Sequence, residues 1–322
     1  APRQYAFCAR AVKGLERIAP RVQGLAQEVV YLIGVDGGGS STRARLLTRE
    51  RQPLAEGRAG ASALGQGIDQ AWRHIEQALS QAHALARTEQ PDLPALSHSN
   101  CALGLGLSGA NNADWLAQFV AANPGYAHLC VDSDAFTALL GAHHGQPGVL
   151  MIAGTGSFGQ ALYADGSRAA VGGWGFPAGD EASGAALGLA AAALTQQTVD
   201  GRRAASALTQ AVLTQVGGTH AALLAWCGQA GQFEFASLAP LVFETEAQDE
   251  AAAQLLQQAV QALELHVKAL DPVGNLPLAF WGSIAQRLLP RLTEPTSQRV
   301  IVPRGDAMDG AVTLCFHRRI SS

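Results

Sequence analysis

The sequence has few charged residues and no run of basic ones. Charged residues make up 15% of the 322 residues, against about 25% in an average soluble domain. The formal net charge is -4, and lysine and arginine form no cluster that could neutralise the phosphates of a nucleic acid. We therefore expect no nucleic-acid partner. The low charge instead indicates extensive buried packing of helices and strands.

The chain also lacks paired cysteines. Its cysteines are odd in number and widely spaced, and no Cys-x-x-Cys pair occurs that could hold zinc or an iron–sulfur cluster. This usage favours a reducing compartment, so we expect the protein in the cytoplasm. The five cysteines are Cys8, Cys101, Cys130, Cys227 and Cys315.

Long apolar runs are absent as well. No stretch approaches the roughly 20 uninterrupted apolar residues that a membrane-spanning helix needs. The arginine-rich residues 1–28 contain no apolar segment followed by a cleavage site, so they do not resemble a secretion signal. We expect no membrane partner, and we interpret residues 1–28 as an N-terminal extension ahead of the first strand.

Length and the order of predicted elements indicate two lobes. A chain of 322 residues exceeds the roughly 150 residues of a typical domain. Each half begins with three strands and continues with helices and further strands. We therefore place one lobe at residues 29–146 and the other at 147–322, with the last helix able to pack back on the first lobe. Strands are predicted over residues 29–34, 43–48, 54–59, 101–107, 128–132, 148–153, 160–163, 168–172, 277–281 and 300–302.

Each half opens on a glycine-rich turn between two strands. Residues 36–42 read DGGGSST and residues 154–157 read GTGS. Because glycine has no Cβ, backbone N–H groups can converge there into a nest for phosphate oxygens, and the serine and threonine hydroxyls add donors. Asp36 is placed to hold Mg²⁺ directly or through water. The expected nucleotide-binding residues are Gly37, Gly38, Gly39, Ser40, Ser41, Thr42, Gly154, Thr155, Gly156 and Ser157.

Two other interpretations of the glycines are weaker. Either turn alone is more often a structural hairpin, but two turns at equivalent points of a repeated order favour a binding role. Residues 104–109 and 154–159 match the dinucleotide pattern G-x-G-x-x-G. In the first match the glycines lie within a strand, and in the second a strand pattern follows instead of a helix, which disfavours a nicotinamide enzyme.

With both turns and the segment GGWGFPAGDEASG at residues 172–184, the sequence resembles the BadF/BadG/BcrA/BcrD-type ATPase family of the actin/hexokinase superfamily. Within this family it resembles the N-acetylglucosamine and glucosamine kinases, over about residues 32–316. The resemblance implies an α/β, duplicated ribonuclease H-like fold (the actin-like ATPase fold), with two lobes and a central cleft. It also implies ATP and Mg²⁺ as cofactors and phosphorylation of an amino sugar at its 6-hydroxyl.

The resemblance assigns roles to individual residues. The family's catalytic aspartate corresponds to Asp134, and a carboxylate there can take the hydroxyl proton as the sugar attacks the γ-phosphate. The alternative role for Asp134 is a helix N-cap. The segment FWGSIA, residues 280–285, occupies the position of the adenosine motif, although the usual Gly-Gly is Trp-Gly here. Gly282 and Ser283 are the implied nucleotide contacts, and the implied substrate contacts are Ser62, Asp134, Thr155, Gly173, Trp174, Gly175 and Asp180.

Several alternatives stay open. The asparagine that many of these kinases carry after the third strand is missing from GASALGQG, residues 60–67, so glucosamine is as plausible a substrate as its N-acetyl form. Trp174 either stacks on the sugar or fills a packing gap. Glu181 either assists at the sugar or pairs locally, and Asp132 is either structural or supports the residues of the site. Asp306 and Asp309 read as caps of the last helix.

Two other functions remain possible within the same superfamily. One is an ATPase that activates a partner enzyme by electron transfer through an iron–sulfur cluster, although the cysteines here sit in apolar segments. The other is a sugar-sensing protein without catalysis, which would need a DNA-binding element that residues 1–28 are too short to form. The alanine-rich helices predicted within residues 181–227 either bury one another or form the face of a homodimer.

Overall fold

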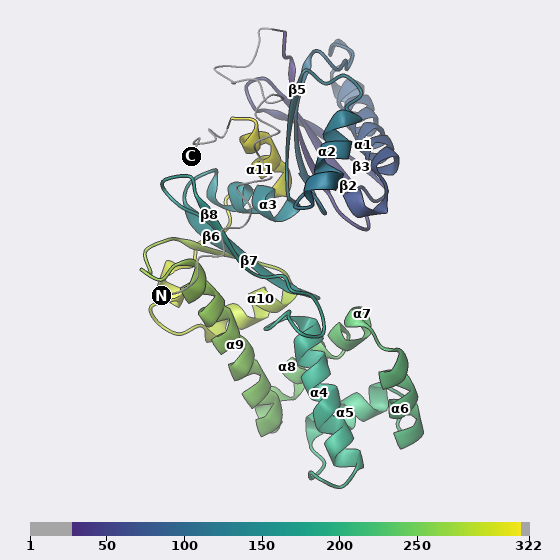
Figure 1. Cartoon of the computed structure of the whole chain (residues 1–322), viewed down its shortest axis with the longest axis vertical. Coiled ribbons are helices and arrows are strands. Elements are labelled where there is room, and N and C mark those ends of the chain that lie inside the picture. The colour runs from purple at the N-terminus through teal and green to yellow at the C-terminus, as the bar shows by residue number, and fades with distance from the viewer. Residues whose placement is uncertain (1–27, 317–322) are drawn as a thin grey trace. The chain divides into compact units, whose positions relative to one another are not determined.

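The computed structural model describes residues 28–316 (Figure 1), and residues 1–27 and 317–322 lie outside the described part. Most of the predicted N-terminal extension therefore lies outside it as well. The described chain divides into two compact units. Unit 1 comprises residues 28–147, 162–167 and 302–316, and unit 2 comprises residues 148–161 and 168–301.

Unit 1 is built on a mixed five-stranded sheet in the order β3-β2-β1-β4-β5. The first three strands are antiparallel neighbours, while β4 runs parallel to both β1 and β5. The strands are β1 (Tyr31–Gly37), β2 (Thr42–Thr48), β3 (Pro53–Ala59), β4 (Cys101–Leu107) and β5 (His128–Asp132).

Side chains of β1 alternate between two buried faces, as the period of a strand requires. Ile33 and Val35 belong to a core cluster that includes Ile75 of α1. Leu32 points to the other face, where it joins a cluster with Val312 of α11. Helices α1 (Ile68–Glu89) and α2 (Ala113–Ala121) cover the first face, and α3 (Asp134–His143) and α11 (Ala307–Leu314) cover the second (Figure 1).

Helix α11 packs backbone against backbone in unit 1. A Cβ at Gly310 would lie 1.7 Å from the carbonyl oxygen of Thr137 in α3, and one at Gly34 of β1 would lie 2.0 Å from that of Met308. Glycine at these positions lets the helix approach so closely. The structure thus ends unit 2 at Ile301 and adds α11 to unit 1. The sequence predicts a second lobe that runs to residue 322, with the last helix able to pack back on the first lobe, and α11 does so.

The start of α11 is fixed by charge as well as by packing. Asp306 caps the helix by accepting from the amide of Asp309, and the Asp309 side chain accepts in return from the amide of Asp306. Both carboxylates also accept from the Arg45 guanidinium on β2. The predicted capping role of Asp306 and Asp309 is confirmed, and the ion pairs extend that role to the contact between helix and sheet.

Unit 2 contains a four-stranded sheet in the order β8-β7-β6-β9. The predicted strand at residues 300–302 is wrong, because Val300 forms only an isolated bridge with Leu278. Pro303 follows closely and has no N–H group with which to continue a ladder. The strands are β6 (Gly148–Ala153), β7 (Ser157–Leu162), β8 (Arg168–Gly172) and β9 (Leu278–Trp281).

The remaining helices belong to unit 2, where α9 and α10 contact β6 and α4 packs on α5, α7 and α8. They are α4 (Gly184–Val199), α5 (Ala207–Gln215), α6 (His220–Gln229), α7 (Gln232–Ala236), α8 (Ala239–Thr245), α9 (Glu250–Leu270) and α10 (Ser283–Leu288). Helix α6 meets α7 through the rings of Trp226 and Phe235. The 3-10 turns of both units are η1 (Leu64–Gln66), η2 (Glu246–Gln248), η3 (Leu289–Arg291) and η4 (Ser297–Arg299).

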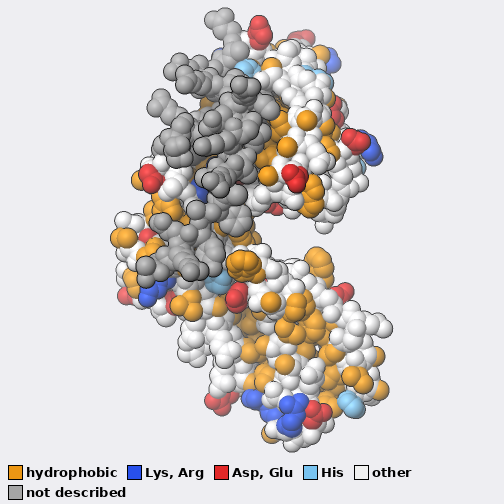
Figure 2. Space-filling model, in the orientation of Figure 1, with side chains coloured by type: hydrophobic (Ala, Val, Ile, Leu, Met, Phe, Trp, Pro, Cys, Tyr) orange, Lys and Arg blue, Asp and Glu red, His pale blue; other side chains and the backbone are white. Residues whose placement is uncertain are grey.

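The surface of unit 2 carries several exposed apolar side chains. In the view of Figure 2, hydrophobic side chains gather over its helical part. Leu224 of α6 and Phe233 of α7 are among the exposed ones. The homodimer inferred from these helices stays a prediction. Within residues 28–316, no helix combines the length and the apolarity needed to cross a membrane.

Candidate functional site

The first glycine turn is the loop at residues 38–41, between β1 and β2. The strand ladder closes with Gly37 opposite Thr42, and the amide of Gly38 donates to the carbonyl of Ser41 at 3.0 Å. Within the described chain, the amides of Gly39, Ser40 and Ser41 donate to no protein acceptor. Three consecutive N–H groups are therefore left for an anion.

Different constraints explain the glycines at residues 37 and 38. A Cβ at Gly37 would lie 2.1 Å from the Ser62 hydroxyl, so packing requires glycine there. At Gly38 nothing lies within 4 Å of the Cβ position, and φ is outside the left-handed region. Neither packing nor backbone conformation requires glycine at residue 38. The approach of a ligand to the backbone would require it.

Thr42 and Ser62 hold this turn in place from within. The Thr42 hydroxyl donates to the carbonyl of Gly60 at 2.6 Å and lies 2.7 Å from the Ser62 hydroxyl. Both side chains are fully buried. The amide of Ser62 donates to the carbonyl of Gly38. The structure thus engages both hydroxyls with protein groups, while Ser40 and Ser41 are exposed.

Three carboxylates lie at the edge of the sheet where β1, β4 and β5 end side by side. Asp36 on β1 and Asp132 on β5 are both paired with Gly106 of β4, and Asp134 follows β5 as the first residue of α3. The Asp36 carboxylate accepts from Arg43 at 2.6 Å. Asp132 accepts from the amide of Ser133 at 2.8 Å.

Asp134 does not cap α3. Ser133 is the N-cap, and its hydroxyl accepts from the amide of Phe136 at 3.2 Å. The N-cap alternative for Asp134 is therefore wrong. The Asp134 carboxylate instead accepts from the amide of Ala135 at 2.8 Å.

The surroundings of Asp134 raise its pKa. Burial raises the pKa of this carboxyl above its usual value, the amide of Ala135 lowers it, and the negative charge of Asp36 raises it again. The influence of Asp36 is that of a like charge close by. A carboxylate with a raised pKa is a better proton acceptor, which suits a general base.

The second glycine turn is the loop at residues 154–156, between β6 and β7. The first amides of α4, from Gly184 and Ala185, donate to the carbonyls of Gly154 (2.7 Å) and Thr155 (3.1 Å). In a trans peptide the C=O and the next N–H point in opposite directions. The amides of Thr155 and Gly156 therefore point away from α4, and within residues 28–316 they have no protein acceptor.

Gly154, like Gly38, has open space at its Cβ position. Nothing lies within 4 Å of its Cβ position, and its φ is outside the left-handed region. Gly282, the N-cap of α10, adjoins this turn, since a Cβ there would lie 2.3 Å from the carbonyl oxygen of Ala153. Ser283 follows and is exposed. The structure thus brings Gly282 together with the second turn.

Asp180 is buried beside the second turn, with only 4% of its surface exposed. Its Oδ1 accepts from the amide of Ser157 at 3.2 Å, and its Oδ2 accepts from Gln232 Nε2 at 2.7 Å. Sequence reasoning missed Gln232, which lies 52 residues further along the chain. No motif surrounds it, so only the fold could reveal this contact.

The segment between β8 and α4 presents the other predicted sugar contacts. Trp174 lies between Gly173 and Gly175, both of which have positive φ, and 83% of its surface is exposed. It does not fill a packing gap, so that alternative is wrong. The Glu181 carboxylate lies 3.9 Å from His266 Nε2 and is half-exposed, which supports local pairing.

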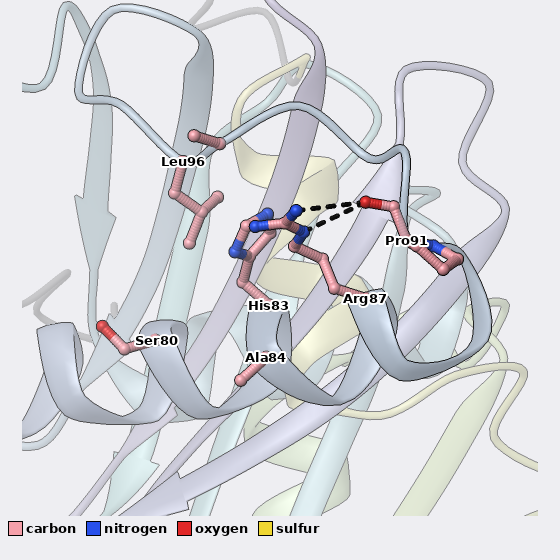
Figure 3. A pocket seen from close by; sticks show the side chains of 7 residues that line it. Ser80, His83, Ala84, Arg87, Pro91 and Leu96 are labelled. Atoms are coloured by element: carbon pink, nitrogen blue, oxygen red, sulfur yellow. Dashed lines mark hydrogen bonds between the residues drawn. The ribbon is translucent and has the colours of Figure 1, made fainter.

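A separate hollow of about 570 Å³ lies on unit 1, where the loop after α1 folds back over the helix (Figure 3). Two of its polar side chains, those of Arg87 and His83, contact backbone carbonyls of the loop. Arg87 donates twice to the carbonyl of Pro91, and His83 Nε2 lies 2.8 Å from the carbonyl of Pro94. The hollow contains none of the predicted site residues. It is lined by Ser80, His83, Ala84, Arg87, Pro91, Ala95 and Leu96.

Comparison with known proteins identifies similar sequences along most of the chain. Residues 33–312 match the family model described as the BadF/BadG/BcrA/BcrD ATPase family. A glucosamine kinase of Vibrio cholerae is 33% identical over 287 residues, which cover 88% of this chain and 94% of the relative. An N-acetylmuramic acid/N-acetylglucosamine kinase of Clostridium acetobutylicum is 29% identical over 254 residues, which cover 76% of this chain and 81% of the relative.

A solved structure extends the similarity to the fold. A Chromobacterium violaceum protein whose assigned name is N-acetylglucosamine kinase matches with a TM-score of 0.80 and 48% identity, over 89% of this chain and 99% of that one. The expected α/β class and the duplicated fold of the actin-like ATPases are confirmed.

Proposed function

The chain belongs to the BadF/BadG/BcrA/BcrD ATPase family, and we propose that it is an ATP-dependent kinase that phosphorylates glucosamine or N-acetylglucosamine at the 6-hydroxyl. The names of its relatives support a sugar kinase. The observation that carries the proposal is the pair of open turns. Each presents consecutive free amides beside a glycine, Gly38 or Gly154, that neither packing nor backbone conformation requires.

Each turn supplies one anion nest for the phosphates of ATP. Consecutive N–H groups without Cβ obstruction suit phosphate oxygens, and they stabilise negative charge without needing a basic side chain. The amides of Gly39, Ser40 and Ser41 form the nest of unit 1, and those of Thr155 and Gly156 form the nest of unit 2. Gly282 and Ser283, next to the second turn, remain our proposed contacts for the adenosine part.

Asp134 acts as the general base in this proposal. It would accept the proton of the 6-hydroxyl while the sugar oxygen attacks the γ-phosphorus in line and ADP leaves. The raised pKa of its carboxyl supports the assignment. The first turn of a helix also favours the ionised form that accepts the proton.

Asp36 fits the magnesium ion that such a reaction uses. Mg²⁺ takes oxygen ligands and is usually held by one or two carboxylates together with substrate phosphates. Asp36 lies at the end of β1 beside the first turn, uses Oδ2 for Arg43, and has Asp134 as a neighbouring carboxylate. Bound there, Mg²⁺ would offset the negative charge of the phosphates.

The segment at residues 172–184 is the proposed place of the sugar. Trp174 is exposed and could stack on the apolar face of a pyranose ring, and Gly173 and Gly175 leave the backbone beside it accessible. Asp180 lies within this segment, and Thr155 adjoins its end, where the amide of Ala185 donates to the Thr155 carbonyl. Ser62 would act by holding the first turn, because its side chain is buried.

The experiment combines a substrate panel with one substitution. ADP release is measured with ATP and glucosamine, N-acetylglucosamine or glucose, and the phosphorylated carbon is identified by NMR. Asp134→Asn should lower kcat at least about 100-fold, as expected for loss of a general base. It should leave the affinity for MgADP within a factor of about two. Substantial turnover by the variant would contradict the base role, and no turnover by the unaltered protein would contradict the kinase assignment.

A further inference from the structure

Gln232 lies at a junction of three groups in unit 2. It is the first residue of α7, and its Nε2 donates to Asp180 Oδ2 at 2.7 Å. The other oxygen of Asp180 accepts from the amide of Ser157 at 3.2 Å, directly after the second glycine turn. The Cβ position of Gly156 lies 3.0 Å from both Asp180 Oδ1 and Gln232 Nε2. The carboxylate and the carboxamide therefore occupy the space beside Gly156.

Asp180 depends on these donors. A carboxylate with only 4% of its surface exposed has given up most of its hydration, so hydrogen bonds must replace it. Its backbone also has φ of 64°, which a residue with a Cβ adopts only when the surroundings hold it there. With one oxygen bound by Ser157 and the other by Gln232, both the position and the plane of the carboxylate are set.

Gln232 is itself held by the packing of α7 on α4. A Cβ at Gly188 of α4 would lie 1.7 Å from the carbonyl oxygen of Phe235 in α7, so the two helices touch backbone to backbone. The same helix α4 binds the carbonyls of Gly154 and Thr155 through its first amides. The pair α4 and α7 thus holds the second turn in two ways. Helix α4 binds the carbonyls of the turn, and α7 acts through Gln232 and Asp180 on the amide of Ser157, directly after the turn.

We propose that Gln232 is a positioning residue for phosphoryl transfer, which rests on the function proposed above. Gln232 fixes the Asp180 carboxylate, Asp180 fixes the amide of Ser157, and the turn then presents the amides of Thr155 and Gly156 to a phosphate oxygen. Preorganised donors of this kind stabilise charge without reorganising during the reaction. Gln232 therefore acts through Asp180 and the turn.

Two substitutions test this, with Gln229→Ala at an exposed position of α6 as the control. Gln232→Ala should lower kcat and weaken MgADP binding, each about tenfold or more, since small misplacements of a site cost up to about 100-fold. Gln229→Ala should match the unaltered protein in both.

Gln232→Glu adds a readout that a general loss of structure would not move. It places a second carboxylate against Asp180, so one of the two should take up a proton at a raised pKa. The activity of Gln232→Glu relative to the unaltered protein should therefore rise as the pH falls. Melting temperatures recorded over the same pH range separate this effect from unfolding.

The outcomes distinguish the two proposals. If the unaltered protein turns over an amino sugar but Gln232→Ala stays within twofold of Gln229→Ala, the role of Gln232 is wrong and the kinase assignment stands. A ratio for Gln232→Glu that does not change with pH also contradicts the role, even if Gln232→Ala fails to fold. If no sugar is turned over, the kinase assignment is wrong, and MgADP binding by Gln232→Ala still decides whether this residue organises the turn.

Discussion

The surroundings of the Asp134 carboxyl oppose its ionisation. Burial and the charge of Asp36 raise its pKa in the folded protein. The charged form therefore destabilises the fold, and this cost is absent below the unfolded pKa of about 4 and grows as the pH rises through the folded pKa. A general base at this position would need such a raised pKa, so the site would gain activity at a cost in stability.

Asp134→Asn should accordingly raise the melting temperature at neutral pH while it removes turnover. Asparagine keeps the shape and can still accept from the amide of Ala135. The gain in stability should shrink towards zero as the pH falls below about 4, where the aspartate becomes neutral in both states. Thermal unfolding of both proteins from acid to neutral pH measures this. An equal difference at every pH would contradict the electrostatic origin.

The open glycines of the two turns allow a second test at the scale of single residues. An alanine at Gly38 or Gly154 would meet no atom within 4 Å and needs no left-handed backbone. We expect Gly38→Ala and Gly154→Ala to keep the melting temperature but to raise KM for ATP at least about tenfold, because the methyl group would keep phosphate oxygens from the amides.

Gly37→Ala is the matched control for the first turn. Its Cβ would lie 2.1 Å from the Ser62 hydroxyl, so we expect a loss of stability of about 1 to 3 kcal/mol from overpacking. Steady-state kinetics and urea unfolding of the three variants distinguish ligand contact from packing. An unchanged KM in both Gly38→Ala and Gly154→Ala would contradict the phosphate nests.

At the scale of elements, the contact between α3 and α11 is sensitive to a single methyl group. The Cβ of an alanine at residue 310 would lie 1.7 Å from the carbonyl oxygen of Thr137, a backbone atom that cannot rotate away. We expect Gly310→Ala to lower the free energy of unfolding by about 3 kcal/mol. Gly228→Ala in α6, where nothing lies within 4 Å, should instead gain about 0.5 to 1 kcal/mol. Urea unfolding measures both, and similar values for the two variants would contradict close packing.

Most elements could be predicted because their signals are local. The alternation of β1 and the helical spacing of α1 are written in consecutive residues, and so are the turns DGGGSST and GTGS. Gln232 carries no local signal, because its partner Asp180 lies 52 residues away and meets it only through the packing of α7 on α4. The strand predicted at residues 300–302 is wrong, because only Val300 pairs, in one bridge with Leu278. Pro303 then ends the pairing, since it has no N–H group to donate.

At the scale of the whole molecule, the units do not follow the order of the sequence. The chain leaves unit 1 after Pro147, contributes residues 162–167 to it, and returns to it again at Val302. Sequence periodicity could mark where the element order starts again, near residue 148. It also allowed the last helix to pack back on the first lobe, but it could not identify the contacts, because the glycines that admit α11, Gly34 and Gly104, read as ordinary strand glycines.

Unit 1 should therefore be unable to keep its stability without the last described helix. The α11 side chains of Met308, Val312 and Leu314 are buried. At about 1.5 to 3 kcal/mol for each buried side chain, they contribute about 5 to 9 kcal/mol. That is comparable with the whole stability of a typical domain, about 5 to 15 kcal/mol. A chain that ends at Ile301 should thus lose most of the free energy that keeps unit 1 folded.

Hydrogen exchange measured by mass spectrometry can test this element by element. In a chain that ends at Ile301, the amides of β1, β4 and α3 should exchange much faster than in a chain that ends at Phe316, which retains every described contact of α11. Protection depends on the free energy of the opening that exposes each amide, so loss of α11 should remove it from the sheet that it covers. Equal protection of β1 and β4 in the two chains would mean that the sheet of unit 1 is stable by itself and that α11 is an addition to it.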